Sequence, residues 1–345
     1  MIRLVVLLMA LAGGARAQEA VTTYAAPDRT PTLTLTLRST TDTVIFAPLL
    51  EAFVTANPTI ALRYEQWGSN ALYDVAREAC DTGAGTTDAV ISSGVHQMVD
   101  LVNRACAQPY VSPLTQALPP ARRWRNEVWG ITQEAAVTIY NTARVPRADV
   151  PGTRFDLLDL LRREPETYRH RIATYDIEAS GLGYLFAFMD SQQATTFGGL
   201  LEGFARVDAI ATCCSAEIIA GVASGRYLMA YNVLESYLAD DDDGRVGVIR
   251  PQDYTLILSR AYVIPRTSPH PAAAAQLLDF ILSPAGQGIL TGQRLVPPMD
   301  PAQVVQSDSA QRPIPISPTL LVAMDGARRR IFVDSWRIAF GTDDH

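Results

Sequence analysis

From residue 32 to residue 106, hydrophobic and polar positions follow two alternating patterns that predict strands and helices in turn. The predicted strands are 32–38, 60–66 and 89–92, and the predicted helices are 44–56, 71–80 and 95–106. Asn57-Pro58 ends the first helix, and glycines at 83 and 85 separate the second helix from the next strand. Strands that alternate with helices of this length are typical of βαβ units with a parallel sheet.

A second series of strands and helices follows a surface connection at 145–154 that is rich in Pro and Arg. We expect an α/β fold with two lobes joined by two hinge crossings, near 133–136 and 251–255. Lobe 1 is predicted to comprise 18–132 together with 255–345, and lobe 2 to comprise 137–250. Such an arrangement closes like a clamshell, with the ligand between the lobes at the carboxyl ends of the strands.

The first 17 residues have the composition of a secretory signal peptide. A positive charge at Arg3 precedes an apolar segment, and Ala15-Arg16-Ala17 is a small-residue cleavage site before Gln18. The apolar segment is too short to span a bilayer, which takes about 20 residues. We therefore expect residues 1–17 to be removed near Ala17 and the mature chain to work outside the cytoplasm.

Composition limits the classes of partner. The 345 residues are 48% hydrophobic and 19% charged, with a formal net charge of −7. A nucleic-acid binder needs a basic patch to replace counterions on phosphate, so we expect no nucleic-acid partner. A small anion remains compatible with this charge, because backbone N–H groups can hold it. We expect a monomer.

The four cysteines allow three pairings. We favour a disulfide between Cys80 and Cys106, since both lie near the ends of successive predicted helices around one strand. Cys213 and Cys214 are adjacent, and adjacent cysteines rarely bridge, so we expect two small buried thiols there. No C-x-x-C motif or His cluster occurs, and we predict neither a metal site nor a cofactor.

Several short motifs, in this order and spacing, resemble the periplasmic solute-binding proteins of ABC importers. They include Ser39-Thr40-Thr41-Asp42-Thr43, Gly130-Ile131-Thr132, Ser180-Gly181-Leu182-Gly183-Tyr184 and the segment 269–287. The last three are similar to the branch of ferric-iron and phosphorylated-solute binders. The resemblance implies a type II periplasmic binding fold, a periplasmic location and delivery of a small solute to an ABC permease. Some members of the branch act with sensor kinases, and the sequence does not separate the two roles.

Four predicted helix starts are rich in hydroxyl, amide and glycine residues. These candidate ligand-binding residues are Ser39, Thr40 and Thr41, Ser92 and Ser93, Ser180, Gly181 and Gly183, and Asn232. A helix start carries unpaired N–H groups and a partial positive charge, so it accepts an anion. The same residue types cap helices without any ligand, and capping is the alternative at each start. Asn70, at the start of another helix, and Tyr262, in the returning segment, are further candidates.

We expect a binding protein for a small anionic solute, phosphorylated or carboxylated. Ferric iron is the second candidate, but the iron binders that this chain resembles use a tandem tyrosine pair. The matching segment here is Tyr231-Asn232-Val233-Leu234, and the chain has no Tyr-Tyr pair. An exported hydrolase is the alternative class. G-x-S-x-G, G-x-G-x-x-G and the phosphate loop are all absent from the sequence, so we expect no enzyme.

Overall fold

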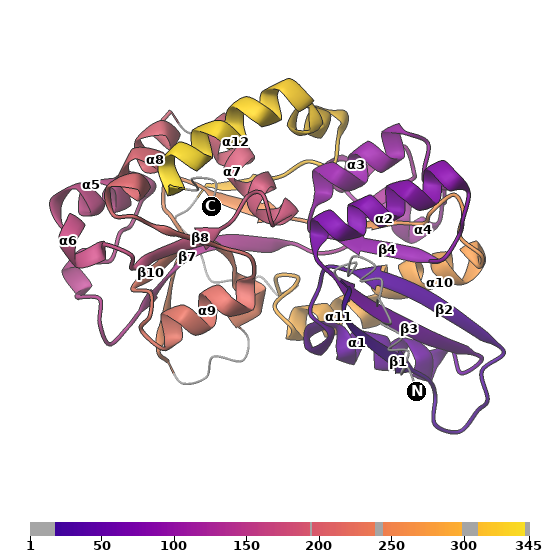
Figure 1. The fold of residues 1–345 in the computed structure, drawn as a ribbon. Coiled ribbons are helices and arrows are strands. Elements are labelled where there is room, and N and C mark those ends of the chain that lie inside the picture. The colour runs from indigo at the N-terminus through magenta and orange to yellow at the C-terminus, as the bar shows by residue number, and fades with distance from the viewer. Residues whose placement is uncertain (1–17, 194, 239–243, 299–309, 342–345) are drawn as a thin grey trace, which may run out of the picture.

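The computed structural model describes residues 18–193, 195–238, 244–298 and 310–341, which form two α/β lobes lying side by side (Figure 1). This arrangement confirms the predicted fold class. The predicted signal peptide at 1–17 lies outside the described residues, as does the acidic run at 240–243. Within the described ranges, no helix combines the length and the apolar character needed to cross a membrane.

Lobe 1 contains a seven-stranded mixed sheet. Its strands are β1 (Gln18–Tyr24), β2 (Leu33–Ser39), β3 (Ile60–Trp67), β4 (Ala89–Ser92), β5 (Arg123–Trp124), β6 (Val128–Gly130) and β13 (Ala261–Val263). They are ordered β1-β3-β2-β4-β13-β6-β5, and β2 runs parallel to both β3 and β4. The carboxyl ends of these three parallel strands therefore meet at one edge, where the next helices begin. β1 was not among the predicted strands, and it pairs antiparallel with β3.

Six helices of the described residues belong to lobe 1. They are α1 (Thr43–Ala56), α2 (Ser69–Thr82), α3 (Val95–Asn103), α4 (Pro113–Ala117), α10 (Pro271–Leu282) and α11 (Pro284–Gly292). Pro284 occupies the first turn of α11, where its missing N–H has no intrahelical partner to lose. Leu49, Leu50 and Phe53 on the inner face of α1 are almost completely buried against the sheet.

Lobe 2 contains a second seven-stranded sheet. Its strands are β7 (Glu134–Asn141), β8 (Ile172–Tyr175), β9 (Ile210–Thr212), β10 (Met229–Leu234), β11 (Val246–Ile249), β12 (Thr255–Leu258) and β14 (Gln311–Pro313). Its helices are α5 (Arg154–Arg163), α6 (Pro165–Tyr168), α7 (Gly181–Gln193), α8 (Phe197–Arg206), α9 (Ser215–Ala223) and α12 (Gly326–Phe340). β8, β9 and β10 run parallel to one another, so α7 and α9 begin at the same edge of this sheet.

The chain passes between the lobes close to the two predicted crossings. β6 of lobe 1 leads into β7 of lobe 2, and β12 of lobe 2 leads back into β13. The two connections lie side by side, because the N–H of Ile131 donates to the carbonyl of Arg260 at 2.9 Å. A third passage follows α11, since β14 pairs with β12 in the second sheet.

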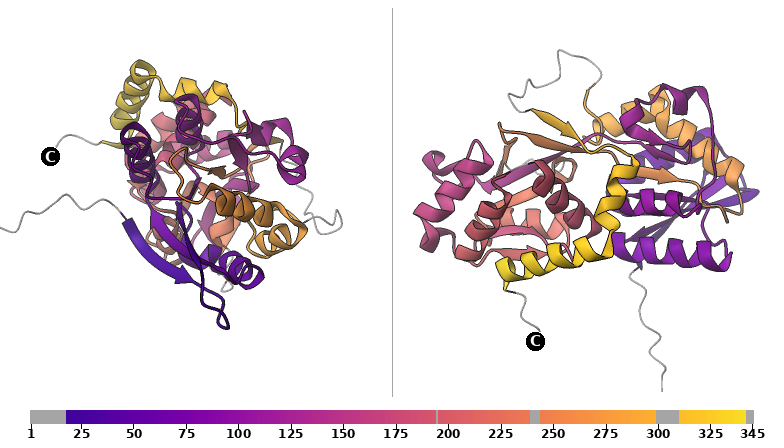
Figure 2. Two further views of the ribbon diagram at one scale, coloured as in Figure 1. Left: turned by 90° about the vertical axis from the view of Figure 1, so that its right-hand side faces the viewer. Right: turned by 90° about the horizontal axis from the view of Figure 1, so that it is seen from above.

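The prediction that 255–345 belongs to lobe 1 is therefore wrong for two segments. β12 pairs antiparallel with β7, and β14 pairs parallel with β12, so both are strands of lobe 2. The last helix, α12, packs on α8 of lobe 2, while the 3-10 helix η4 (Pro318–Met324) packs on α3 of lobe 1. Figure 2 shows this C-terminal segment lying along both lobes. These contacts join segments far apart in the sequence, so no local sequence pattern predicts them.

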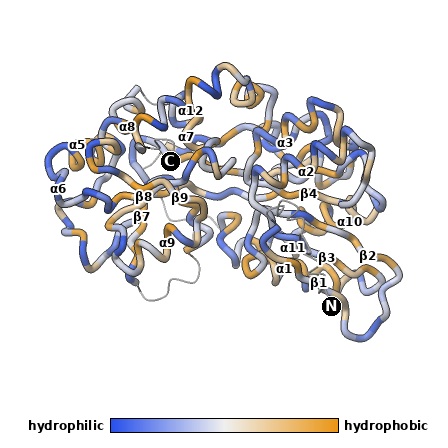
Figure 3. Tube along the Cα trace, viewed as in Figure 1, coloured by the Kyte–Doolittle hydropathy of each residue, from blue (hydrophilic) through white to orange (hydrophobic). Residues whose placement is uncertain are grey.

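Hydrophobic residues lie along the strands and the inner helix faces, whereas the outer helix α6 is mostly hydrophilic (Figure 3). One apolar cluster joins the lobes, since it includes Val90 and Val128 of the first sheet and Ala136 and Ala173 of the second. The two lobes therefore share a continuous core at the hinge.

The cysteines form two disulfides. Cys80–Cys106 is confirmed, and it ties the last turn of α2 to the segment after α3. The expectation of two buried thiols at Cys213 and Cys214 is wrong, because these neighbours are bonded to each other and both are exposed. They occupy the turn between β9 and α9, and not the core.

Candidate functional site

A cleft of about 640 Å³ lies between the lobes. The lining residues from lobe 1 are Glu19, Thr40, Asp42, Gln66, Trp67, Gly68, Ser69, Asn70, Ala71 and Ser93. Those from lobe 2 are Tyr175, Ala179, Ser180, Leu182, Cys213, Cys214, Ser215, Ala216 and Tyr237. Most of these residues carry a hydroxyl, amide or carboxyl group, so the cleft suits a polar solute.

Five helices begin at this cleft, as residues at or just before their first turns line it. Three belong to lobe 1 (α1, α2 and α3) and two to lobe 2 (α7 and α9). Each start follows a strand at the carboxyl edge of its sheet, which is why starts from both lobes meet. The partial positive charges of the helix dipoles therefore converge between the lobes.

The starts differ in how many N–H groups are still available. The N–H of Thr43 in α1 donates to Gln66 Oε1, and those of Gly181 and Gly183 in α7 donate to Ser69 and Ser180 Oγ. In the part of the chain that the structure describes, the first-turn N–H groups of α2 and α9 have no protein acceptor. They face the cleft from opposite lobes, beside Asn70 and Ala216.

Direct hydrogen bonds hold the lobes together at one side of the cleft. Asn70 Nδ2 donates to the carbonyls of Glu178 at 2.8 Å and Ala179 at 3.2 Å. Ser69 Oγ accepts the N–H of Gly181 at 2.8 Å. A Cβ on Gly181 would lie 2.9 Å from the amide of Gln97 in α3, so glycine permits this close approach. The start of α2 is therefore both a wall of the cleft and a contact between the lobes.

Two carboxylates line the cleft, and none of its described lining residues is Arg or Lys. Burial raises the pKa of Asp42, although the Arg260 charge and a hydrogen bond from Tyr237 oppose this shift. Glu19 Oε2 accepts from Gln66 Nε2 at 2.8 Å. An anion in this cleft therefore depends on neutral N–H and O–H donors, while the carboxylates can accept hydrogen bonds from a solute that carries donors.

A buried ion pair lies beneath the cleft at the hinge. Arg260 donates from Nε to Glu134 Oε1 at 2.8 Å and from Nη1 to Thr41 Oγ1 at 2.9 Å. Burial alone would lower the pKa of Arg260, but the Glu134 carboxylate raises it. Thr132 and Ser236 also donate to this carboxylate, which joins both hinge connections to η3 (Glu235–Leu238). Glu134 neutralises the arginine, so the pair fixes the hinge and adds no net charge to the cleft.

Two tyrosines of lobe 2 line the cleft. Tyr175 shares a hydrogen bond of 2.6 Å with Ser215 Oγ, and burial raises the pKa of Tyr175 to about 12. Tyr237 donates to Asp42 Oδ1 at 3.3 Å across the lobes, and burial raises its pKa as well. Both phenols therefore stay protonated at neutral pH and act as hydrogen-bonding groups.

Four of the predicted site residues line the cleft. They are Thr40, Asn70, Ser93 and Ser180. The N–H of Ser93 donates to Thr40 Oγ1 at 2.9 Å, so these two residues join the turns after β2 and β4. Whether any of the four contacts a solute stays a prediction.

Five others lie directly behind the lining. Ser39, Thr41 and Ser92 are buried, and their side-chain oxygens accept from Thr41 N, Arg260 Nη1 and Gly94 N. Gly181 and Gly183 use their N–H groups within the fold, and a Cβ on Gly183 would lie 2.4 Å from Tyr175 Cβ. These residues shape the helix starts, which was the alternative considered for each of them.

Asn232 and Tyr262 do not lie at the cleft, so their placement as cleft residues is wrong. Asn232 is in β10, which continues through Leu234, and not at a helix start. Its φ of 58° is one that asparagine tolerates, and its Nδ2 donates to buried Asp190. Tyr262 is fully buried in β13, where its hydroxyl donates to the Ala274 carbonyl at 2.7 Å.

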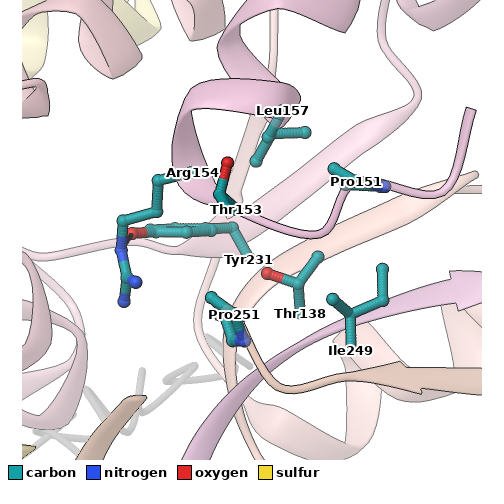
Figure 4. A pocket seen from close by; sticks show the side chains of 8 residues that line it. All are labelled: Thr138, Pro151, Thr153, Arg154, Leu157, Tyr231, Ile249 and Pro251. Atoms are coloured by element: carbon teal, nitrogen blue, oxygen red, sulfur yellow. Dashed lines mark hydrogen bonds between the residues drawn. The ribbon is translucent and has the colours of Figure 1, made fainter. Parts of the chain in front are cut away.

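Tyr231, the residue compared with the iron-binding tyrosines, belongs to a buried cluster inside lobe 2 (Figure 4). Its hydroxyl accepts from Arg154 Nε at 2.6 Å and donates to Asp190 Oδ2 at 2.7 Å. The space beside this cluster is too narrow to hold a water molecule. Burial raises the pKa of Tyr231 strongly, so its phenol is a structural hydrogen-bonding group without access to a solute.

The cleft also contains residues that were not predicted from the sequence. Trp67 ends β3, Gly68 precedes α2, and Ser215 begins α9 directly after the cysteine pair. The turn before α9 has the same strand–turn–helix order as the predicted starts. Its signal was a hydroxyl residue at a helix start, but the two cysteines before it were interpreted as buried thiols. Tyr237 lies in η3, within the short helix predicted to begin at Asn232, but it was not selected as a cleft residue.

A family model described as "Bacterial extracellular solute-binding protein" matches residues 39–288. No curated protein matches the chain. Among solved structures, the substrate binding protein of the ABC transporter from Agrobacterium tumefaciens is 31% identical. It aligns with a TM-score of 0.87 over 94% of this chain and 99% of its own.

More distant structures share the fold. Iron-bound HitA from Pseudomonas aeruginosa is 18% identical, with a TM-score of 0.69 over 88% of this chain and 99% of its own. AfuA from Actinobacillus pleuropneumoniae, solved with fructose-6-phosphate, is 14% identical, with a TM-score of 0.69 over 90% of this chain and 100% of its own. At these identities the likeness shows the fold alone.

Proposed function

Because the chain belongs to the bacterial extracellular solute-binding proteins, we propose that it captures a small anionic solute, phosphorylated or carboxylated, between its lobes. Proteins of this family bind small solutes and deliver them to ABC permeases. Capture needs no chemical step, so the protein acts as a carrier and not as an enzyme. It works in the periplasm as a monomer, after removal of residues 1–17.

The observation that carries the proposal is the convergence of helix starts from both lobes on one cleft. An anion between α2 and α9 receives N–H donors from both lobes. It thereby links them, which favours the closed form. Hydroxyls of Thr40, Ser93 and Ser180 add donors around it. Neutral donors suffice, because a helix start carries about half a positive charge.

Ferric iron is the second candidate, since two tyrosines and two carboxylates line the cleft and HitA was solved with iron. Three features favour the anion. Burial raises the pKa of Tyr175 and Tyr237, so both resist the deprotonation that iron coordination needs. Tyr231 has no access to a solute. Within the described residues, no three His, Cys, Asp or Glu side chains gather as they would to hold a metal ion.

A charge placed at the start of α9 tests the proposal. Ala216 occupies the first turn of α9, is exposed and lines the cleft. Ala216→Asp favours the helix through its dipole but repels an anion bound at the same N–H groups. We expect at least about a tenfold loss of affinity for the best ligand among inorganic phosphate, glucose 6-phosphate and citrate, which is about 1.4 kcal/mol. Calorimetric titration measures it.

Ala285→Asp is the matched control, because Ala285 is an exposed first-turn alanine of α11 and does not line the cleft. It should leave the affinity unchanged. Equal affinities of the wild type and Ala216→Asp for the same anion would refute binding at α9. A wild type whose melting temperature rises with ferric ion, but with none of the three anions, would favour the iron alternative.

A further inference from the structure

The exposed Cys213–Cys214 disulfide forms part of the cleft wall, although it contributes no group that binds an anion. Both cysteines line the cleft next to Ser215 and Ala216, at the start of α9. Cys214 precedes the first residue of α9, and its side chain caps no N–H group. A disulfide offers no N–H or O–H donor, so it cannot bind a phosphate or carboxylate group as the helix starts do.

The rest of the cleft shows what else a solute must offer. The cleft has a volume of about 640 Å³, and one water molecule occupies about 30 Å³ in the liquid. The cleft is therefore far larger than a phosphate ion. Glu19 and Asp42 would repel a bare anion, but they accept hydrogen bonds from hydroxyl groups. These features together fit an anion that carries a hydroxylated carbon skeleton.

Trp67 and Leu182 add apolar surface to the same cleft from the two lobes. The Trp67 ring is held in place, because its Nε1 donates to Glu65 and the Arg38 guanidinium lies 5.4 Å from the ring centroid. Sulfur is polarizable and makes favourable dispersion contacts with C–H groups. The disulfide joins the two sulfur atoms in one rigid turn, so it presents a preformed apolar surface.

We propose that the Cys213–Cys214 disulfide is a ligand contact that packs against the carbon skeleton of the solute while the neighbouring start of α9 holds its anionic group. This inference rests on the proposed function and names the solute more closely, as a phosphorylated or carboxylated polyol. The disulfide selects for the skeleton, and the helix starts select for the charge. Its removal therefore weakens binding of the whole solute more than binding of the anion alone.

The double variant Cys213→Ala/Cys214→Ala tests the contact with two probes, glucose 6-phosphate and inorganic phosphate. We expect the wild type to bind glucose 6-phosphate more tightly than phosphate. The variant should lose about tenfold in affinity for glucose 6-phosphate and keep its affinity for phosphate. Cys80→Ala/Cys106→Ala is the control, because it removes a disulfide that does not line the cleft and should leave both affinities unchanged.

The outcomes separate the inference from the proposed function. An unchanged affinity of the double variant for glucose 6-phosphate, or equal losses for both probes, would overturn the ligand contact and leave anion capture standing. Equal affinities of the wild type for phosphate and for glucose 6-phosphate would also overturn the ligand contact. If the wild type binds neither probe nor citrate, both proposals fail. Two alkylated thiols at 213 and 214 in the unreduced protein, detected by mass spectrometry, would overturn the inference at once.

Discussion

Asp42 precedes α1 and is one of the two carboxylates that line the cleft. Burial raises its pKa, so the folded protein binds a proton more readily at this position than the unfolded chain does. Asp42 therefore contributes stability at acid pH, and this contribution is lost as pH rises through the raised pKa. Its charge at neutral pH opposes an anion in the same cleft.

Asp42→Asn should increase the affinity for inorganic phosphate at pH 7 by about fivefold, which corresponds to about 1 kcal/mol of repulsion. Asparagine keeps the acceptor for Tyr237 and remains a good residue before a helix. The free energy of unfolding of the variant should also fall less than that of the wild type between acid and neutral pH, because asparagine does not titrate. Titrations and urea unfolding across this range measure both effects. Asp74→Asn, at an exposed carboxylate of α2, should change neither, and a weaker phosphate affinity in Asp42→Asn would contradict the account.

The Glu134–Arg260 pair at the hinge should be costly to break. Glu134→Ala leaves the Arg260 charge buried without its carboxylate, which costs about 3–5 kcal/mol. Urea denaturation measures the loss. Glu202→Ala breaks exposed pairs with Arg162 and Arg206 and should cost at most about 1 kcal/mol. Similar losses in the two variants would show that Arg260 does not depend on Glu134 to compensate its buried charge.

At the residue scale, the sequence predicted the helix starts better than the side chains around them. Thr40, Ser93 and Ser180 were found because hydroxyl residues before a helix are a local signal. Trp67 and Tyr237 reach the cleft through the course of β3 and η3, which no local signal reports. Asn232 was misplaced because an asparagine after a strand suggests a cap, whereas a bulge in β10 lets the strand continue.

At the scale of elements, the parallel strands and first three helices of lobe 1 follow the predicted pattern closely. β2, predicted as 32–38, is Leu33–Ser39, and α1, predicted as 44–56, is Thr43–Ala56. Their strong periodicity and clear ends explain this agreement. β14 was not predicted, since its exposed three residues have no apolar pattern and are ordered by pairing with β12.

The Cys80–Cys106 disulfide, which ties α2 to the segment after α3, should stabilise the fold by restricting the conformations of the unfolded chain. Its sequence separation of 26 corresponds to about 3.5 kcal/mol. Cys80→Ala/Cys106→Ala should lose about that amount in urea denaturation. The Cys213–Cys214 disulfide closes almost no loop, so Cys213→Ala/Cys214→Ala should lose far less stability. The opposite ranking of the two double variants would contradict this explanation.

At the scale of the molecule, the lobes meet through a shared core at the hinge and through two hydrogen bonds at the start of α2, where Ser69 Oγ accepts the N–H of Gly181 and Asn70 Nδ2 donates to the Glu178 carbonyl. A solute that contacts both lobes adds to these contacts and so favours the closed form. The two-lobed architecture followed from alternating strands and helices. The return of the last segment to lobe 2 did not, since it depends on contacts between distant parts of the chain.

The most direct test is a crystal structure of the protein grown with glucose 6-phosphate. The account predicts the phosphate group between the lobes, with its oxygens accepting from the first-turn N–H groups of α2 and α9 beside Asn70 and Ala216. A phosphate bound on the outer surface, or a cleft whose solute is held by Tyr175 and Tyr237 around a metal ion, would contradict it.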